Sequence, residues 1–231
     1  MDDGPHIISD EREIAIVFLR APTLGQVKTR LIKHLDSTWV LRLYKSFSLD
    51  VIEAVRKQIQ QVRICYFPAD RGGLVKEWLG HTFEYEPQTG RDLGERIKNA
   101  FLSAFSDGFC RVVLVGTDIP ELSQALIAEA FQKLQNHLSV IGPSYDGGYY
   151  LIGFHRDGFK SQVFDEIQWG SSEVFNKTLS ILNKLNLKTH ILPVCRDIDT
   201  FDDLMDMIKN LKPKKNSAKN TAACLKSLGF I

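Results

Sequence analysis

The residues best placed for chemistry are charged side chains that directly follow short apolar runs. Asp118 lies in the loop 116–120, immediately after the apolar run 111–115. A carboxylate at such a position can bind a hard cation, and Mg²⁺ in proteins usually combines carboxylates with substrate phosphates. The structural alternative is a turn that Asp118 forms before Pro120. Ser123 is the better cap for the helical pattern that follows, so the spacing favours a metal ligand.

Two further acidic loops lie later in the chain. Asp146 precedes Gly147 and Gly148, and Asp199 precedes Thr200. Asp-Gly-Gly is a common turn signal, and Thr200 can cap a helix. Two glycines beside a carboxylate also allow a ligand to approach the backbone closely. Asp199 has no comparable structural explanation, so both carboxylates are candidates for the same site as Asp118.

A basic loop follows the first apolar run, 14–19. It contains Gly25, Lys28 and Arg30. Backbone amides freed at the glycine, together with the two charges, could hold a diphosphate or triphosphate. The spacing matches neither the P-loop nor the Gly-x-Gly-x-x-Gly dinucleotide fingerprint. A solvated turn before a helix explains the same residues equally well.

Gln88 follows another expected strand, 82–85, and its side chain carries both a hydrogen-bond donor and an acceptor. Such a side chain could read the edge of a nucleobase. Asp92 and Glu95 follow it with the three-residue spacing of a capping box, which predicts the start of a helix.

The elements that would position these loops alternate between apolar runs and helical repeats. Continuous apolar runs predict strands that are buried on both faces. Apolar residues at three- and four-residue steps predict helices behind the caps Asp36, Asp92, Ser123 and Ser171–Ser172. The expected strands are 14–19, 62–67, 82–85, 111–115 and 138–141. This alternation predicts an α/β fold with a mostly parallel central sheet, helices on both faces in three layers, and ligands at the carboxyl ends of the strands.

The second half of the chain changes character. The segment 142–153 holds four glycines and three tyrosines, which predicts a hairpin turn that leads into a strand. The segment 209–219 is basic and polar and precedes an amphipathic stretch at 222–228. We therefore predict one domain over 1–211, followed over 212–231 by a basic linker and a short helical appendage.

Bulk composition excludes several classes of partner. The 231 residues carry a net charge of +1, which gives no support for binding nucleic acid or an acidic membrane surface. The apolar runs are far shorter than the ~20 residues of a membrane span. No basic and apolar leader precedes the first strand, and the four cysteines have no metal or redox spacing. These features predict a cytoplasmic protein with reduced thiols.

Five ordered segments resemble the bacterial glycosyltransferase-like family of nucleotide-diphospho-sugar transferases, some members of which are assigned to arsenosugar biosynthesis. The resemblance spans roughly 14–211, and Arg20 stands where the family usually has lysine. The segments are Arg20-x-Pro-x-x-Gly-x-Val-Lys-Thr-Arg-Leu, Gln88-x-Gly-x-Asp-Leu-Gly-x-Arg, Gly-x-Asp118-x-Pro-x-Leu, Gly-Pro-x-x-Asp146-Gly-Gly-Tyr-Tyr-Leu-Ile-Gly and Asp197-Ile-Asp-Thr-x-x-Asp-Leu.

The resemblance implies the GT-A, or nucleotide-diphospho-sugar transferase, fold and assigns roles to residues of this chain. It implies Mg²⁺ or Mn²⁺ held by Asp118 and Asp146, with Asp118, Asp146 and Asp199 as catalytic residues. It implies substrate contacts from Gly147, Gly148 and Tyr149. The nucleotide-binding residues that it implies are Arg20, Gly25, Lys28, Arg30, Gln88, Gly94 and Arg96.

Three functions are compatible with these residues. The first is a metal-dependent glycosyltransferase that takes a nucleotide sugar and a small-molecule acceptor. The second is a nucleotidyltransferase that moves a nucleoside monophosphate from a triphosphate to a phosphorylated small molecule. The third is a nucleotide-binding module without turnover, which the presence of all three loop aspartates disfavours. A homodimer stays an open alternative.

Overall fold

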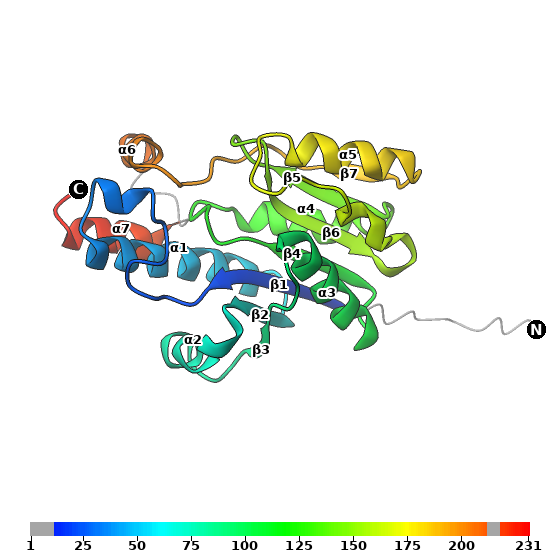
Figure 1. Ribbon diagram of the computed structural model, residues 1–231, viewed down its shortest axis with the longest axis horizontal. Helices are drawn as coiled ribbons and strands as arrows, with labels where there is room; N and C mark the ends of the chain where they lie inside the picture. Colours follow the sequence, from blue (N-terminus) through cyan, green and yellow to red (C-terminus); the bar gives the residue numbers. More distant parts are fainter. Residues whose placement is uncertain (1–11, 212–217) are drawn as a thin grey trace, which may run out of the picture.

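The computed structural model describes residues 12–211 and 218–231, and its centre is one seven-stranded sheet with the order β3-β2-β1-β4-β6-β5-β7 (Figure 1). Only β6 runs antiparallel to its neighbours, β4 and β5. The strands are β1 (Glu13–Arg20), β2 (Val62–Phe67), β3 (Glu84–Pro87), β4 (Arg111–Val115), β5 (Ser139–Pro143), β6 (Tyr149–His155) and β7 (Thr189–Ile191). The predicted mostly parallel sheet and the β5–β6 hairpin are confirmed.

Helices cover both faces of the sheet, as predicted, and give three layers (Figure 1). Along β1, residues 15, 17 and 19 enter the core beneath α1 and α4, whereas residues 14, 16 and 18 enter the core beneath α3 and α5. The helices are α1 (Ser37–Arg56), α2 (Gly72–Leu79), α3 (Leu93–Ser106), α4 (Gln124–Lys133), α5 (Val174–Lys184), α6 (Phe201–Asn210) and α7 (Lys219–Ser227). Burial on both faces explains why the strands have continuous apolar sequences.

Four helices begin at the caps that the sequence predicts. Asp36, Asp92, Ser123 and Thr200 each accept a hydrogen bond from a backbone amide of the first helical turn. The expected serine cap of α5 is wrong, because that helix begins at Val174 and its N-cap makes no side-chain bond. The amide of Phe175 instead donates to the carbonyl oxygen of Gly147 at 2.9 Å. The start of α5 is therefore bound to the acidic loop after β5.

One strand boundary differs from the sequence prediction, and one strand was not predicted. The strand expected at 82–85 lies at Glu84–Pro87, and the short edge strand β7 was not predicted. The N-terminal segment 1–11 and the part of the predicted basic linker at 212–217 lie outside the described residues. None of the helices in the described part of the chain has the length and apolarity needed to cross a bilayer.

The last helix, α7, packs against α1 and α6. Cys224 and Leu225 of α7 share a core cluster with residues of both helices. The N-cap position Ala218 offers no side-chain bond, and Asp50 of α1 supplies the missing acceptor. Its carboxylate accepts the amides of Asn220 at 2.8 Å and Thr221 at 2.9 Å. A buried side chain of α1 therefore caps α7 from outside the helix.

Replacing Asp50 with alanine tests this cap. Asp50→Ala leaves buried amides and the Thr221 hydroxyl without acceptors, so we expect the free energy of unfolding to fall by about 2–3 kcal/mol. Urea unfolding measures the loss, and hydrogen exchange should show the amides of α7 exchanging faster. Glu53→Gln, one turn further along α1, should change stability by less than about 0.5 kcal/mol. Equal effects of the two substitutions would contradict the capping role.

Candidate active site

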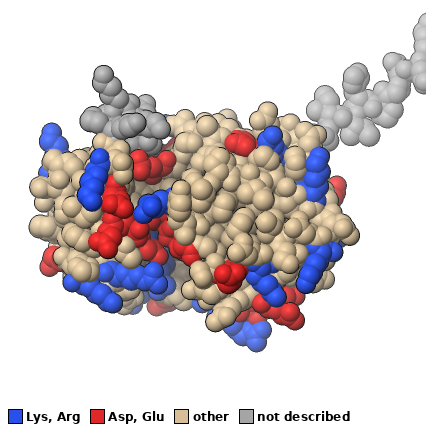
Figure 2. Space-filling view, turned by 90° about the horizontal axis from the view of Figure 1, so that it is seen from above, with Lys and Arg blue, Asp and Glu red and all other residues tan. Residues whose placement is uncertain are grey.

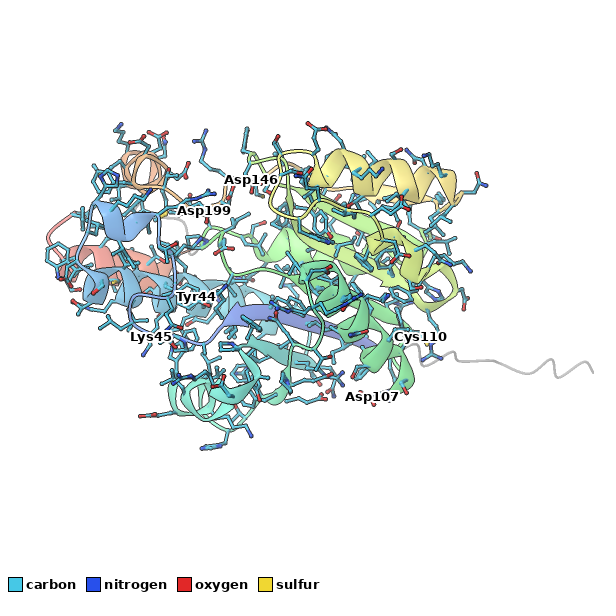
Figure 3. The ribbon with its side chains drawn as sticks, in the orientation of Figure 1. Tyr44, Lys45, Asp107, Cys110, Asp146 and Asp199 are labelled. Carbon is cyan, nitrogen blue, oxygen red and sulfur yellow. The ribbon has the colours of Figure 1, made fainter. Side chains whose placement is uncertain are left out.

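The charged loops meet at one edge of the sheet. This edge holds the carboxyl ends of the parallel strands β1, β2 and β4, and it borders a cavity of about 660 Å³. Seen from above, acidic side chains gather at a hollow in the molecular surface (Figure 2). Figure 3 places Asp146 and Asp199 at this edge and Asp107 and Cys110 at the opposite one. The position agrees with the rule for ligand sites in α/β sheets.

The centre of the site is an ammonium group between two carboxylates. Lys28 Nζ lies 2.5 Å from Asp118 Oδ1 and 2.7 Å from Asp199 Oδ1. The Lys28 side chain is 5% exposed, whereas that of Asp118 is 50% exposed. Arg30 adds a looser contact, 3.6 Å from Asp199 Oδ2. Three loops that are far apart in the sequence are thus joined through one buried cation.

The backbone holds these groups in place. Lys28 has a left-handed φ of 46°, and Gly25 before it has a φ of 75°, so the loop curls and directs the lysine inward. The amide of Ile198 donates to the carbonyl oxygen of Asp118 at 3.0 Å. Burial opposes the charged form of Lys28, but Asp118 and Asp199 outweigh it and hold the pKa of the ammonium above its ordinary value.

Tyr44 of α1 supports the loop from beneath. Its hydroxyl donates to the carbonyl oxygen of Arg20 at 2.7 Å and accepts the amide of the same residue at 2.8 Å. Burial, and then the charge of Asp118, raises the pKa of Tyr44 to about 12. The phenol therefore stays neutral and fixes the end of β1 where the loop begins.

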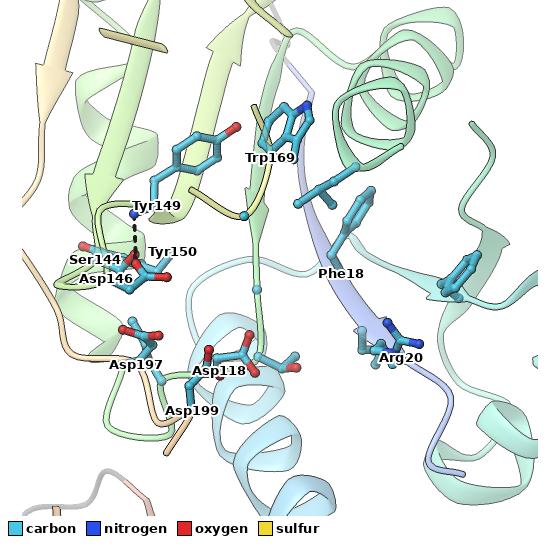
Figure 4. Close-up of a pocket in the computed structure, with 18 of the residues that line it drawn as sticks. Phe18, Arg20, Asp118, Ser144, Asp146, Tyr149, Tyr150, Trp169, Asp197 and Asp199 are labelled. Atoms are coloured by element: carbon cyan, nitrogen blue, oxygen red, sulfur yellow. Dashed lines mark hydrogen bonds between the residues drawn. The ribbon is translucent and has the colours of Figure 1, made fainter. Parts of the chain in front are cut away.

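Two more carboxylates lie on the β5 side of the cavity (Figure 4). Asp146 Oδ1 accepts the Ser144 hydroxyl at 2.5 Å and the Gly148 amide at 2.9 Å. Burial raises the pKa of Asp197 to about 6, with a further contribution from the charge of Asp146. Negative charge is therefore in excess on this side, beyond what Lys28 neutralises.

The donor set fits a divalent cation. Mg²⁺ and Mn²⁺ prefer carboxylate oxygens, and the lysine ammonium demonstrates that Asp118 and Asp199 can contact one cation together. In the described part of the chain, no three His, Cys, Asp or Glu side chains converge on one point. Phosphate and water oxygens would therefore have to complete the coordination, as is usual for Mg²⁺. The carboxylate that shares a cation with Asp118 is Asp199, whereas Asp146 lies beside Asp197.

On the β2–β3 side the cavity carries an aromatic ring that two guanidinium groups approach. The Arg96 guanidinium lies 3.8 Å from the centroid of the Phe67 ring, and that of Arg20 lies 5.5 Å from it. Gln88 Nε2 donates to the carbonyl oxygens of Cys65 at 2.8 Å and Leu19 at 3.3 Å. Both partners are acceptors only, so the amide orientation of Gln88 is fixed. The N–H groups of Nε2 are thus used by β1 and β2. No described residue donates to the oxygen Oε1, which can therefore accept a hydrogen bond from a ligand.

The remaining wall of the cavity is aromatic (Figure 4). Tyr149 at the start of β6 meets Trp169 edge to face, with ring centroids 6.3 Å apart. Phe18 of β1 lies opposite. Trp169 packs on Gly94 of α3, where a Cβ atom would lie 2.5 Å from the indole nitrogen. This half of the cavity is uncharged, in contrast to the carboxylate half.

Most of the predicted site residues reach the cavity. Those that line it are Arg20, Lys28, Arg30, Gln88, Arg96, Asp118, Asp146, Gly148, Tyr149 and Asp199. Three predicted glycines do not line it and have structural roles instead. Gly25 permits the loop conformation and Gly94 makes room for Trp169. Gly147 has a φ of 89° and packs so tightly on the loop before α5 that a Cβ atom would lie 1.9 Å from a carbonyl oxygen.

Sequence reasoning missed four residues of the site. Asp197 begins the last of the five segments that carry the family resemblance. Its position two residues before Asp199 could have marked it as a further acidic residue of the site. Tyr44, Phe67 and Trp169 carried no local signal, because their roles depend on contacts with other elements. Tyr44 in particular lies where the apolar periodicity of α1 predicts an ordinary core residue.

The chain has the nucleotide-diphospho-sugar transferase fold. The chain belongs to the family described as "Uncharacterized protein conserved in bacteria (DUF2064)", whose model matches residues 50–171. A Desulfovibrio desulfuricans protein, provisionally assigned as a nucleotide-diphospho-sugar transferase, is 37% identical. Its crystal structure superposes with a TM-score of 0.88, covering 93% of this chain and 94% of that one. No curated protein matches the chain.

More distant structures share the fold alone. The 4-diphosphocytidyl-2C-methyl-D-erythritol synthase of Anaerococcus prevotii is 12% identical with a TM-score of 0.58, covering 87% of this chain and 97% of that one. A Mycobacterium tuberculosis protein crystallised with manganese is 16% identical with a TM-score of 0.55, covering 87% of this chain and all of the other. At these identities the likeness concerns architecture only.

The raised pKa of Asp197 predicts a pH-dependent stability. Between the unfolded pKa near 4 and the folded value of about 6, the folded state binds more protons, so stability falls as pH rises. Asp197→Asn should therefore raise the free energy of unfolding at pH 8 by about 1 kcal/mol, a value reduced because the side chain is partly exposed to solvent. The gain should vanish at pH 4.

Urea unfolding at the two pH values measures this effect. The exposed Asp165→Asn is the matched control and should show the pH profile of the unaltered protein. A profile for Asp197→Asn that runs parallel to the unaltered one would mean that Asp197 ionises without penalty.

Proposed function

We propose that the chain is a metal-dependent glycosyltransferase that transfers a sugar from a nucleotide diphosphate to a small-molecule acceptor. The observation that carries this proposal is the division of one cavity into two halves. One half holds Lys28 with Asp118 and Asp199, and the other is aromatic and uncharged. A nucleotide sugar has the same division, with a charged diphosphate joined to an uncharged sugar ring.

The charged half suits the leaving diphosphate. Lys28 and Arg30 lie in this half, and Arg20 lines the same cavity toward Phe67; all three would bind phosphate oxygens as negative charge develops on them. A divalent cation bound at Asp118 would neutralise the same charge when the sugar leaves. The loop geometry keeps the backbone of Lys28 at this edge before a ligand arrives, so only its side chain would have to turn toward the phosphates.

The β2–β3 side suits the nucleoside. Gln88 Oε1 is a fixed acceptor, so it would bind an N–H group on a base edge and could not bind a carbonyl oxygen there. Arg96 lies against Phe67 and presents a flat cation over which a base can stack. The distance between this side and Lys28 would be bridged by the ribose.

The aromatic half suits the sugar and the acceptor. Tyr149 and Trp169 offer apolar ring surfaces for the C–H faces of a sugar, and they limit the access of water to the reacting carbon. Gly148 would let the backbone approach the ligand closely. Asp146 uses Oδ1 for the bonds to Ser144 and Gly148, so its Oδ2 would accept a hydroxyl group of the ligand. We propose Asp118, Asp146 and Asp199 as the catalytic carboxylates.

Nucleotidyl transfer is the second candidate. Distant structures with this fold include proteins named as a cytidylyltransferase and a nucleotidyl transferase, and a synthetase crystallised with CTP. The same loops would then hold a triphosphate, and a phosphorylated small molecule would attack it. The 37% identical relative, assigned as a nucleotide-diphospho-sugar transferase, supports the first candidate over this one.

A ligand panel followed by thermal melting tests the proposal. A nucleotide sugar at about a hundred times its dissociation constant should raise Tm by about 5–10 °C in the presence of Mn²⁺. Asp118→Ala should lose the part of the shift that depends on Mn²⁺, because it removes a cation ligand while Lys28 keeps Asp199 as a partner. Glu77→Gln on the exposed face of α2 is the control and should keep the full shift.

The panel contains nucleoside triphosphates and nucleotide sugars of each common base, with and without Mn²⁺. A response to triphosphates but to no nucleotide sugar would favour nucleotidyl transfer. A protein whose Tm responds to no nucleotide would contradict both candidates.

A further inference from the structure

The lysine at the centre of the site occupies the place that a metal ion would need. We propose that Lys28 and a divalent cation compete for the same oxygens of Asp118 and Asp199, so that the cation binds tightly only after a nucleotide diphosphate has drawn Lys28 away. This inference rests on the proposed function and adds to it an order of events. Lys28 acts as a positioning residue that couples two ligands.

The distances put Lys28 and a cation in competition. Lys28 Nζ lies 2.5 Å and 2.7 Å from the two carboxylate oxygens. A Mg²⁺ ion binds carboxylate oxygens at about 2.0–2.1 Å, so an ion that approaches these two oxygens from the side of the ammonium would overlap it. Two cations in contact would also repel each other strongly at a site where the lysine is only 5% exposed. The binding of one cation therefore opposes the binding of the other.

Lys28 needs a new anion before it can leave. A buried ammonium without a partner is costly, and the curled loop directs this side chain inward. Arg20 at the carboxyl end of β1 and Arg30 in the following loop line the same cavity as Lys28. A diphosphate bound between these residues would offer Lys28 an alternative anion within the same loop.

Charge balance then makes the binding of the diphosphate and the binding of the cation cooperative. Without a ligand, one ammonium serves two carboxylates, and Arg30 assists at a distance of 3.6 Å. When the diphosphate takes Lys28, the carboxylates lose that partner and attract a cation. Because coupling between two binding sites is reciprocal, the cation must raise the affinity for the nucleotide by the same factor.

Mn²⁺ binding to the ligand-free protein tests the competition directly. Electron paramagnetic resonance reports free Mn²⁺ without any turnover. We expect Lys28→Met to bind Mn²⁺ at least tenfold more tightly than the unaltered protein. Arg30→Met removes an equal charge beside Asp199 without vacating the shared position, so it should strengthen binding only about twofold to threefold. The double variant Lys28→Met with Asp199→Asn should lose the gain.

The coupling has its own readout. Saturating nucleoside diphosphates of each base should raise the Mn²⁺ affinity of the unaltered protein at least tenfold, after correction for Mn²⁺ held by free nucleotide. Lys28→Met should show a clearly smaller increase, limited to what direct ligation of Mn²⁺ by phosphate oxygens contributes, because its carboxylates are already accessible. Lys28→Gln should behave in the same way, which guards against a folding defect in one variant. Circular dichroism and melting verify that both are folded.

Two outcomes would overturn the proposal. Equal Mn²⁺ affinity of the unaltered protein and Lys28→Met would show that the lysine does not compete, while leaving the glycosyltransferase function intact. Absence of Mn²⁺ binding in every variant, with Tm still raised by nucleotide sugars, would remove both the competition and the metal dependence of the proposed function.

Discussion

The ion pairs of Lys28 with Asp118 and Asp199 are the interaction on which the site depends. A buried ammonium must have partners, and here the partners come from the loop after β4 and the loop before α6. The bond between Ile198 and Asp118 fixes these two loops to each other. One lysine therefore joins three distant segments of the chain at the place where phosphates and a cation would bind.

The sheet makes this convergence possible. Parallel strands deliver their following loops to one edge, and the switch to the antiparallel strand β6 brings Tyr149 to that edge from the opposite direction. The charged and aromatic halves of the cavity thus follow from strand direction. The helices behind the sheet contribute individual supports, such as Tyr44 beneath Arg20 and Gly94 beneath Trp169. Some residues, such as Tyr44, therefore belong both to the core and to the support of the site.

Much of this arrangement could be predicted from local patterns. Continuous apolar runs indicated the buried strands, and side-chain caps such as Asp92 and Thr200 marked the helix starts, because both signals act within a few residues. The predicted start of α5 was wrong because the carbonyl group of Gly147, which is distant in the sequence, takes the place of a local side-chain cap. The pairing of Lys28 with Asp199 and the fixed amide of Gln88 were also beyond sequence reasoning, since they arise from contacts across the fold.

The most direct measurement is a crystal structure of the protein with Mn²⁺ and a non-hydrolysable nucleotide sugar. The account predicts the ion on Asp118 and Asp199, the diphosphate on Lys28, and the sugar against Trp169 and Tyr149. In that structure Lys28 Nζ should be within hydrogen-bond distance of a phosphate oxygen and beyond ion-pair distance of both aspartates. A complex in which Lys28 still joins the two carboxylates, with the nucleotide bound elsewhere, would contradict it.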